Sequence, residues 1–392
     1  MIRDLPRVVL KEGREKKIRG RYPWVQRGEV LRVEGKSEPG AEARLFAHNG
    51  DFLAVGTLHE GIRFPFRVFS LEDEPLGVDF FRRRIREALA RREGAAPDTN
   101  ARRVVFAEAD GLPGLIVDQY DDVLAVQVRQ MGVERLKPAW LEAIVDVLKP
   151  RAIMERSDME SRRDEGLEPT SQPLVGDVPE TVEIVESGLK FLVPVREGLK
   201  TGFYLDQRET RRQFAAEVTP GMRVLDAFCY TGAFSLHAAR AGADVVGVDL
   251  AEGAVETARA NAELNGLDVR FDLANAFDWL VDSAKMGPSF DAVVLDPPAI
   301  SKSRDRRDSL KWAVWRLVHS ALPILKPGGR LVVCSCSYQL SLDAMIDTIR
   351  LAANDRGRAA YVDRVTLQAP DHPYLIQFPE SLYLKCAWVR AA

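Results

Sequence analysis

One stretch, residues 223–249, limits the possible folds of this chain more than any other. It begins with an apolar run that ends in Asp226, passes through a short loop, and continues into a helix-patterned segment at 233–240. A second apolar run at 244–248 then ends in Asp249. A strand, a tight loop, a helix and a second strand in this order are typical of the first half of a doubly wound, Rossmann-like α/β fold. We therefore expect a parallel sheet with a ligand site at its carboxyl edge.

The loop after the first strand is poor in glycine, which narrows the choice of ligand. A dinucleotide site uses Gly-x-Gly-x-x-Gly to bring backbone amides against a pyrophosphate, whereas Gly232 stands almost alone here. Asp226 would repel phosphates but suits a cationic amino-acid group, so S-adenosylmethionine (SAM) fits better than NAD. Asp249, about 20 residues beyond the loop, stands where a carboxylate reaches ribose hydroxyls. A Rossmann-like repeat without a ligand is the alternative, but two acids at strand ends serve no packing need.

The length and composition of the chain indicate an ordinary multidomain protein. Its 392 residues exceed one typical core, so two or three domains are expected. No apolar run is long enough to cross a bilayer, and the N-terminal segment has no signal-peptide core, so we expect a cytoplasmic protein. The four cysteines contain no Cys-x-x-Cys pair, which argues against a zinc site and a disulfide framework.

The patterning predicts three domains. Residues 1–72 read as short strands of a small β-barrel or rolled sheet, with a hairpin turn at Asn49-Gly50. Residues 73–185 read as a small α/β domain, which includes one helix at 133–148 and a polar loop at 155–168. Residues 186–392 form the Rossmann-like domain, in which Gln207 and Arg208 are expected to be exposed near the start of a helix.

Basic residues near the N-terminus suggest a polyanionic partner. The whole chain has a net charge of −3, yet residues 1–35 carry ten Lys or Arg against five Asp or Glu, a local balance of +5. Basic side chains interleaved with aromatic ones suit an RNA-facing surface. The alternative for the tryptophan is that it fills the small core. The candidate RNA-binding residues are Arg14, Lys16, Lys17, Arg19, Arg21 and Trp24.

Two further strand ends carry polar residues that are suited to binding or to catalysis. Asp296-Pro297-Pro298 follows an apolar strand and leaves a carboxylate and carbonyls to accept hydrogen bonds from an exocyclic amine. Cys336 follows another strand, and a thiolate at this edge could add to carbon 6 of a pyrimidine and activate carbon 5. Cys334 lies within the apolar run and reads as core. A buried structural role is the alternative for Cys336, but its company at the sheet edge favours the nucleophile.

The motifs FYLDQR (203–208), LDAFCYTGAFSLHAA (225–239), LDPPA (295–299) and CSCS (334–337) resemble those of the RlmI-type family of large-subunit ribosomal RNA cytosine-5 methyltransferases. The likeness extends over essentially the whole chain. It implies a PUA domain, a small central α/β domain and a class I SAM-dependent methyltransferase domain. By this resemblance Cys336 is the nucleophile and Asp296 holds the cytosine edge. The residues that it implies around SAM are Gln207, Arg208, Asp226, Phe228, Cys229, Tyr230, Thr231, Gly232, Asp249, Leu250, Asn275, Ala276, Phe277 and Asp296.

The chain departs from the family pattern at two positions, and several functions remain open. Asn275 stands where many SAM enzymes place Asp, and Ala299 replaces an aromatic residue that often follows Asp-Pro-Pro. The expected function is cytosine carbon 5 methylation of 23S ribosomal RNA. The rivals are methylation of a purine exocyclic nitrogen without a covalent step, methylation of uracil carbon 5, and an RNA-binding ribosome-assembly factor with a vestigial SAM pocket. The residues leave the target nucleotide and the oligomeric state open, and a homodimer is compatible with them.

Overall fold

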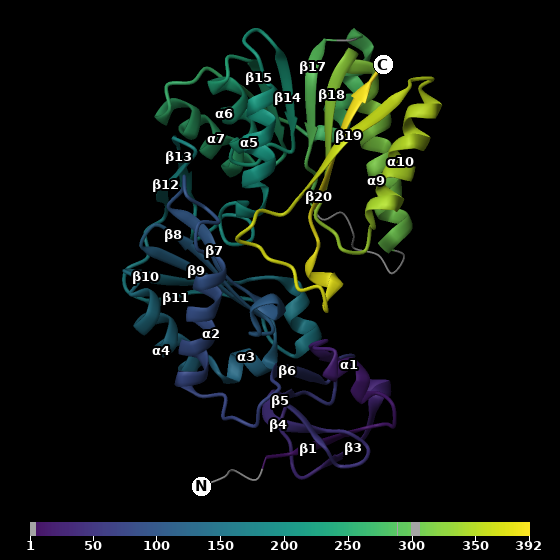
Figure 1. The fold of residues 1–392 in the computed structure, drawn as a ribbon. Helices are drawn as coiled ribbons and strands as arrows, with labels where there is room; N and C mark the ends of the chain where they lie inside the picture. The colour runs from purple at the N-terminus through teal and green to yellow at the C-terminus, as the bar shows by residue number, and fades with distance from the viewer. Residues whose placement is uncertain (1–4, 288, 299–305) are drawn as a thin grey trace. The chain divides into compact units, whose positions relative to one another are not determined.

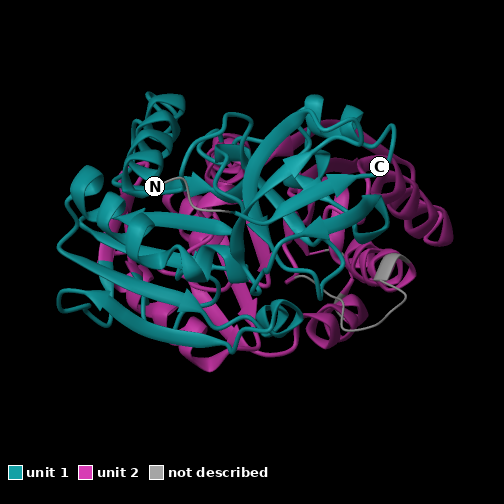
Figure 2. Cartoon of the chain, turned by 90° about the horizontal axis from the view of Figure 1, so that it is seen from below, with its two compact units in different colours: residues 1–182, 193–202, 370–381 teal, residues 183–192, 203–369, 382–392 magenta. Residues whose placement is uncertain are grey.

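The computed structural model of the chain describes residues 5–287, 289–298 and 306–392, and these residues form two compact units (Figure 2). Unit 1 holds residues 1–182, 193–202 and 370–381, and unit 2 holds residues 183–192, 203–369 and 382–392. Among the described residues, no helix has the length and apolar character needed to span a bilayer.

Unit 1 begins with a six-stranded sheet in the order β2-β6-β5-β4-β1-β3. Its strands are β1 (Arg7–Leu10), β2 (Trp24–Val25), β3 (Val30–Glu34), β4 (Ala41–Phe46), β5 (Phe52–Leu58) and β6 (Phe66–Ser70), and the short helix α1 (Glu15–Arg19) follows β1. The sheet closes over a core that includes Val8, Leu45 and Phe66. The predicted hairpin at Asn49-Gly50 joins β4 to β5. This sheet confirms the predicted rolled β-structure.

The second sheet of unit 1 has the order β11-β10-β9-β8-β7 and packs against two long helices. Its strands are β7 (Ala101–Phe106), β8 (Leu115–Tyr120), β9 (Val123–Val128), β10 (Ala152–Ser157) and β11 (Thr170–Val175), and its helices are α2 (Val78–Arg91), α3 (Met131–Arg135) and α4 (Lys137–Leu148). The single helix predicted at 133–148 is wrong. Two helices occur there, because Pro138 lacks a backbone N–H and begins a new helix at its first turn.

The polar loop predicted at 155–168 is also wrong. Glu155 and Arg156 belong to β10 and are buried, and Arg162 is buried in a 3₁₀ segment (Glu160–Glu165). The Glu155 carboxylate lies 3.1 Å from Lys137 Nζ and 3.5 Å from an Arg162 nitrogen. Charged residues that neutralise one another can be buried, whereas their sequence pattern resembles that of a solvated loop.

Unit 1 also includes the segment 370–381, which belongs to the C-terminal part of the chain. Asp371 is fully buried; its carboxylate accepts the backbone N–H of Arg103 at 2.9 Å and its backbone carbonyl accepts Nε of Arg92 at 2.9 Å. The Phe378 ring lies 4.5 Å from that of Trp24 and 5.5 Å from that of Tyr22. Buried polar and aromatic contacts therefore hold this segment within unit 1.

Unit 2 is built on a seven-stranded sheet in the order β16-β15-β14-β17-β18-β20-β19 (Figure 1). Its strands are β14 (Arg223–Ala227), β15 (Asp244–Asp249), β16 (Arg270–Leu273), β17 (Phe290–Leu295), β18 (Leu325–Ser335), β19 (Ala360–Leu367) and β20 (Lys385–Ala391). The first five are parallel, and β20 runs antiparallel to β18 and β19. The chain order reverses between β14 and β17, so a ligand is expected beyond their carboxyl ends.

Helices cover both faces of this sheet, as Figure 1 shows. They are α5 (Arg208–Glu217), α6 (Ala233–Arg240), α7 (Glu252–Leu264), α8 (Ala276–Ser283), α9 (Arg306–Ala321) and α10 (Leu342–Asp355), and a separate hairpin pairs β12 (Val182–Glu186) with β13 (Leu189–Val193). Leu225 packs in one core with residues of α8, α9 and α10, while its neighbour Val224 packs in the other core with Phe214 of α5. This alternation confirms the predicted doubly wound architecture.

Candidate active site

The loop between β14 and α6 has the strained geometry of a ligand-binding turn. Phe228, Tyr230 and Gly232 have φ angles of +68°, +49° and +82°. A side chain at Gly232 would begin 3.0 Å from the Phe271 ring, so the close packing at this point requires glycine. Non-glycine residues in this conformation cost free energy and cluster at functional sites. The loop predicted from the glycine-poor sequence therefore has a backbone conformation of the kind found at functional sites.

Asp226 at the end of β14 is buried beneath this loop. Its Oδ2 accepts hydrogen bonds from the Ser235 N–H at 2.9 Å and from the Ser235 hydroxyl at 2.6 Å. Burial raises the pKa of Asp226 to about 6, the Ser235 bonds oppose that rise, and the charge of Asp249 adds to it. Within the described part of the chain, Asp226 Oδ1 and the nearby Thr231 hydroxyl are buried without a hydrogen-bond partner. These atoms fit a ligand that carries an ammonium or amine group.

Asp249 at the end of β15 links the β14–α6 loop to the residues that follow β15. Its Oδ2 accepts the Tyr230 N–H and its Oδ1 accepts the Ala251 N–H, each at 2.9 Å. Each carboxylate oxygen has a further lone pair, so the group can still accept the two hydroxyls of a ribose. The next residue, Leu250, is mostly exposed.

Beyond β16, Asn275 begins α8 and serves as its N-cap. The Asn275 Oδ1 accepts the Phe277 N–H at 2.9 Å, which leaves one lone pair for an adenine amine. The ring centroids of the half-buried Phe228 and Phe277 lie 5.5 Å apart. Ala276, which precedes Phe277, is small and buried. An apolar surface of this kind suits an adenine ring. The resemblance thus assigned to SAM a set of residues that the fold brings to one edge of the sheet.

Gln207 and Arg208 are not exposed, contrary to expectation. Each is 1% exposed, at the start of α5, and Gln207 Oε1 accepts the Cys386 thiol at 3.4 Å. The helix α5 packs against α6 and β19. Within the described residues Gln207 Nε2 has no hydrogen-bond partner. The amide therefore retains donors for a ligand or an ordered water molecule.

The Asp296-Pro297-Pro298 turn and Cys336 meet at the neighbouring strand ends. Pro297, Pro298, Cys336 and Ser337 line one cavity of about 20 Å³ together with residues of α9. This volume holds about one water molecule, so the cavity is too small to contain a nucleobase. Ala299, the second departure from the family pattern, lies outside the described residues.

Cys336 differs from the other cysteines in its exposure. It is half-buried, whereas Cys229, Cys334 and Cys386 are buried. Burial raises the pKa of the Cys229 and Cys334 thiols well above the ordinary value, which keeps both as unreactive thiols. Cys334 packs in the sheet core, as predicted. Cys336 is therefore the most exposed of the four cysteines.

Tyr204 is a site residue that sequence reasoning missed. Its ring lies 5.2 Å from that of Tyr230, and burial raises its pKa, with further contributions from Asp296, Asp206, Cys336 and Asp249. The Tyr204 phenol therefore interacts electrostatically with acids at the ends of both β15 and β17. The motif FYLDQR contained the signal, but only the fold relates this motif to the other strand ends. In the described segments no group of three or more His, Cys, Asp or Glu could hold a metal ion.

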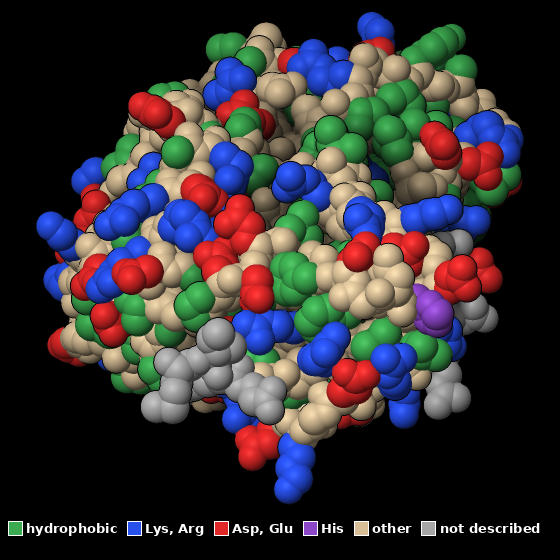
Figure 3. All heavy atoms as spheres, turned by 60° about the horizontal axis from the view of Figure 1, so that its bottom comes forward, with side chains coloured by type: hydrophobic (Ala, Val, Ile, Leu, Met, Phe, Trp, Pro, Cys, Tyr) green, Lys and Arg blue, Asp and Glu red, His purple; other side chains and the backbone are tan. Residues whose placement is uncertain are grey.

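The N-terminal candidate RNA-binding residues lie on and around α1 in unit 1. Arg14, Lys16, Arg19 and Arg21 are exposed, and Arg19 pairs with Asp51 at 2.9 Å. Trp24 is half-buried; its Nε1 donates to Glu108 at 2.9 Å and its ring packs on Phe64 and Phe378. Trp24 thus packs within unit 1, but it is not among the residues of the core of the six-stranded sheet, so its interpretation as a filler of that core is not confirmed. Figure 3 shows basic and acidic side chains interspersed on one face of the molecule.

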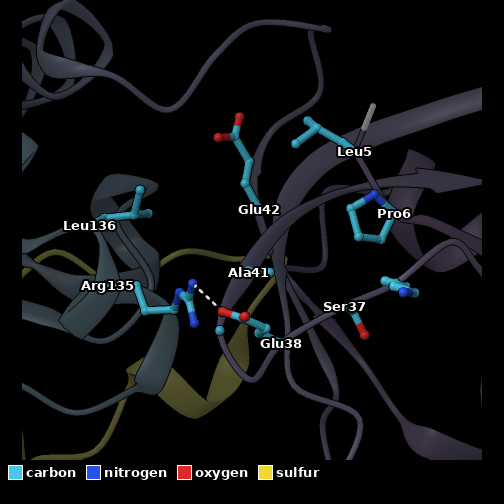
Figure 4. A pocket seen from close by; sticks show the side chains of 10 residues that line it. Leu5, Pro6, Ser37, Glu38, Ala41, Glu42, Arg135 and Leu136 are labelled. Carbon is cyan, nitrogen blue, oxygen red and sulfur yellow. Dashed lines mark hydrogen bonds and ion pairs between the residues drawn. The ribbon is translucent and has the colours of Figure 1, made fainter. Parts of the chain in front are cut away.

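A larger hollow, of about 700 Å³, lies in unit 1 between the first sheet and α3. Figure 4 shows Glu38 and Arg135 pointing toward one another across it, and their ion pair is 2.8 Å long. Another acid of its lining, Glu42, accepts the Leu76 N–H at 3.2 Å. Because Glu38, Arg135 and Glu42 already have partners and the lining lies far in the sequence from the strand ends of unit 2, its size does not make it the candidate active site.

Comparison with protein families gives two matches along the chain. Residues 8–71 match PUA-like domains, and residues 160–375 match S-adenosylmethionine-dependent methyltransferases. The first match covers the six-stranded sheet of unit 1, and the second includes β14, β15, β17 and β18. The PUA-like and methyltransferase domains expected from the sequence are confirmed.

Curated relatives and solved structures match nearly the full chain. Ribosomal RNA large subunit methyltransferase I of Aeromonas hydrophila is 37% identical over 98% of this chain and 99% of its own. The protein of the same name from Shewanella amazonensis is 38% identical over 97% and 98%. The crystal structure of SMU.776 in complex with SAH has a TM-score of 0.86 at 21% identity, and covers 98% of this chain and 99% of that one. At that identity the structure supports the fold.

Proposed function

Because this chain belongs to the family of SAM-dependent methyltransferases that includes the proteins named ribosomal RNA large subunit methyltransferase I, we propose that it methylates carbon 5 of a cytosine in large-subunit ribosomal RNA. Membership of this family supports SAM-dependent methylation of that RNA as the general reaction. The observation that supports cytosine carbon 5 as the target atom is the half-buried Cys336 beside the Asp296-Pro297-Pro298 turn.

The proposed chemistry begins with Cys336. Its thiolate adds to carbon 6 of the cytosine, so a carbon–sulfur bond forms and the electron pair of the 5,6 double bond moves to carbon 5. SAM supplies an activated methyl group on its sulfonium. Carbon 5 takes that methyl group, a base removes the carbon 5 proton, and the thiolate leaves as the 5,6 double bond re-forms. The electron pair that moved to carbon 5 becomes the bond to the methyl group, and the methyl–sulfonium pair stays on the sulfur of SAM. The carbon 5–hydrogen pair becomes the new 5,6 double bond, and the carbon–sulfur pair returns to Cys336.

Asp296 provides the proposed selection of cytosine. A carboxylate at a turn of two prolines accepts hydrogen bonds from the exocyclic amine, whereas uracil would present a carbonyl there and be repelled. The base must leave any helical stack to reach this edge of the sheet, as is usual for enzymes that modify a base.

The SAM site that we propose lies around the β14–α6 loop. The unpartnered Oδ1 of Asp226 and hydroxyl of Thr231 suit the amino-acid end, and Asp249 suits the ribose. The Phe228–Phe277 pair and the Asn275 amide suit the adenine. The remaining proposed contacts are Gln207, Arg208, Cys229, Tyr230, Gly232, Leu250, Ala276 and Asp296.

Substrate capture is assigned to unit 1. We propose that the basic residues around α1 contact ribosomal RNA phosphates. We also propose that the protein acts in the cytoplasm, where ribosomes assemble. The division into domains at 1–72, 73–185 and 186–392 also stays a proposal. Its first domain corresponds to the PUA-like match at 8–71, while the methyltransferase match at 160–375 begins earlier than the third domain.

The test compares wild type with Cys336→Ala on large-subunit ribosomal RNA that lacks natural modifications. The expected result is 5-methylcytidine from wild type alone, read by mass spectrometry of the digested nucleosides. RNA containing 5-fluorocytidine should trap wild type as a covalent adduct on a denaturing gel, because fluorine cannot leave as a proton does. Cys334→Ala, which truncates a buried cysteine two residues earlier, is the matched control and should still make both products.

Other outcomes favour the rival functions. Equal methylation by wild type and Cys336→Ala, with the label on a purine, would favour nitrogen methylation. Methylated uridine would overturn the role of Asp296. Failure of wild type to bind SAM by calorimetry would favour a non-catalytic assembly factor.

A further inference from the structure

Lys385 is a buried lysine next to the strand that ends at Cys336. It begins β20 and pairs with Ser335 of β18 and with Leu367 of β19. The residue is 5% exposed, although lysine is almost never buried without a partner. Its position, 49 residues beyond Cys336 in the sequence, results from the antiparallel pairing of β18 and β20.

The Lys385 ammonium holds the turn that follows Cys336. Its Nζ donates to the backbone carbonyl of Ser337 at 2.6 Å and to that of Leu340 at 2.7 Å. A further bond within the turn runs from the Gln339 N–H to the Ser337 hydroxyl at 3.3 Å. One side chain therefore sets the path of the backbone immediately beyond the cysteine.

The charge of this ammonium has no carboxylate partner among the residues that the structure describes. Burial lowers the pKa of Lys385 to about 8, while electrostatic interactions with the sulfur groups of Cys336 and Cys386 act in the opposite direction. A buried cation without an anion is costly. Of the two sulfur groups that act on Lys385, Cys336 is the one that reaches solvent.

We propose that Lys385 is a positioning residue for Cys336, and that its ammonium both fixes the Ser337–Leu340 turn and stabilises the Cys336 thiolate. This inference rests on the proposed function, because it takes Cys336 as the nucleophile. A neighbouring cation is a recognised means of making a cysteine reactive near neutral pH. The lysine thereby supplies the positive charge that a thiolate needs at an edge otherwise rich in acids.

Several groups at this sheet edge disfavour a negative charge on the cysteine. Asp296 at the end of β17 and Tyr204 before α5 both belong to this edge, and Asp206 accepts the Tyr383 hydroxyl at 2.5 Å nearby. Cys334 and Cys386 lie on the adjoining strands. All of these groups are neutral or negative, so each either leaves the thiolate unaffected or opposes it. Among the described residues, Lys385 is a positive group whose electrostatic interaction with Cys336 opposes their effect.

The experiment measures the pH dependence of Cys336 alkylation by iodoacetamide in the full chain, quantified on the Cys336 peptide by mass spectrometry. Lys385→Gln keeps hydrogen-bond donors but removes the charge, Lys385→Met removes both, and Lys385→Arg keeps the charge. We expect alkylation at pH 7 to slow by about tenfold or more in the first two variants, with the midpoint at higher pH, and Arg to restore the wild-type profile. Lys326→Met is the matched control, because Lys326 lies near the other end of β18 and pairs with Asp291.

A Lys385→Gln protein with the melting temperature and alkylation midpoint of wild type would overturn the proposal. A shifted midpoint in Lys385→Gln but not in Lys385→Arg supports it, since a purely structural lysine would not distinguish these variants by charge. The assay uses neither RNA nor SAM. Absence of 5-methylcytidine from wild type would therefore refute the proposed function, while the alkylation profile would still decide the role of Lys385.

Discussion

At the scale of single residues, Asp226 shows how a site carboxylate affects stability. Burial raises its pKa to about 6 in the folded chain, against about 3.9 for an unfolded Asp. The folded state therefore keeps a proton that the unfolded state has lost, and stability falls as pH rises from about 4 through 6. A shift of roughly 2 units corresponds to about 3 kcal/mol at most.

We expect Asp226→Asn to remove this pH dependence. Its amide carbonyl can still accept from Ser235, and it carries no charge to bury. Urea unfolding between pH 4 and 8 should give a flatter curve than wild type and greater stability above pH 6, with weaker SAM binding by calorimetry. Asp244→Asn, an exposed acid at the opposite end of the next strand, is the control. Parallel pH curves for wild type and Asp226→Asn would contradict the argument.

At the scale of elements, the β14–α6 loop depends on a left-handed glycine in a crowded position. Gly232→Ala places a methyl group 3.0 Å from Phe271 and 3.1 Å from Ala258 and Leu236. Gly221 has nearly the same φ angle, +84°, and a Cβ atom added there would have no neighbour within 4 Å. The Gly221→Ala variant therefore isolates the backbone cost of about 1–2 kcal/mol. Both variants should lose this stability in urea unfolding. Only Gly232→Ala should lose more, and only it should weaken SAM binding by about tenfold or more in calorimetry.

At the scale of the whole molecule, the charge distribution predicts salt-dependent RNA binding. The chain is slightly acidic, yet Arg14, Lys16 and Arg21 are exposed near α1. Replacing these three by Ser should weaken binding of a large-subunit rRNA fragment, and reduce the slope of log K against log salt by about 2 for a single-stranded contact. Fluorescence anisotropy over a salt series measures this slope.

The control for net charge removes three other exposed basic residues. Arg212, Arg350 and Lys190 each pair with a nearby acid in unit 2. Their triple replacement by Ser changes the total charge by the same amount and should leave the slope near that of wild type. An equal loss in both triple variants would indicate a general effect of charge and contradict a specific RNA surface on unit 1.

Several buried polar residues were not predictable from local patterns. Arg211 of α5 and His237 of α6 both contact Glu186 of the β12–β13 hairpin, at 2.7 and 3.2 Å. Burial alone would raise the pKa of Glu186, but the Arg211 and His237 interactions lower it to about 2. Such residues resemble surface positions in a sequence, because the partner that permits their burial is distant along the chain.

Local sequence patterns predict the strands of the sheet, the acids at their ends and the loop with one glycine, because hydrophobic periodicity and turn chemistry depend on residues close together in the chain. These patterns therefore predict Asp226, Asp249, Asp296 and Cys336 as residues that meet at one sheet edge. In contrast, the burial of Gln207 and the contact of Lys385 with the turn after Cys336 follow from the three-dimensional packing of distant segments. Those contacts join segments far apart in the chain, and their free energy exists only after the strands have paired.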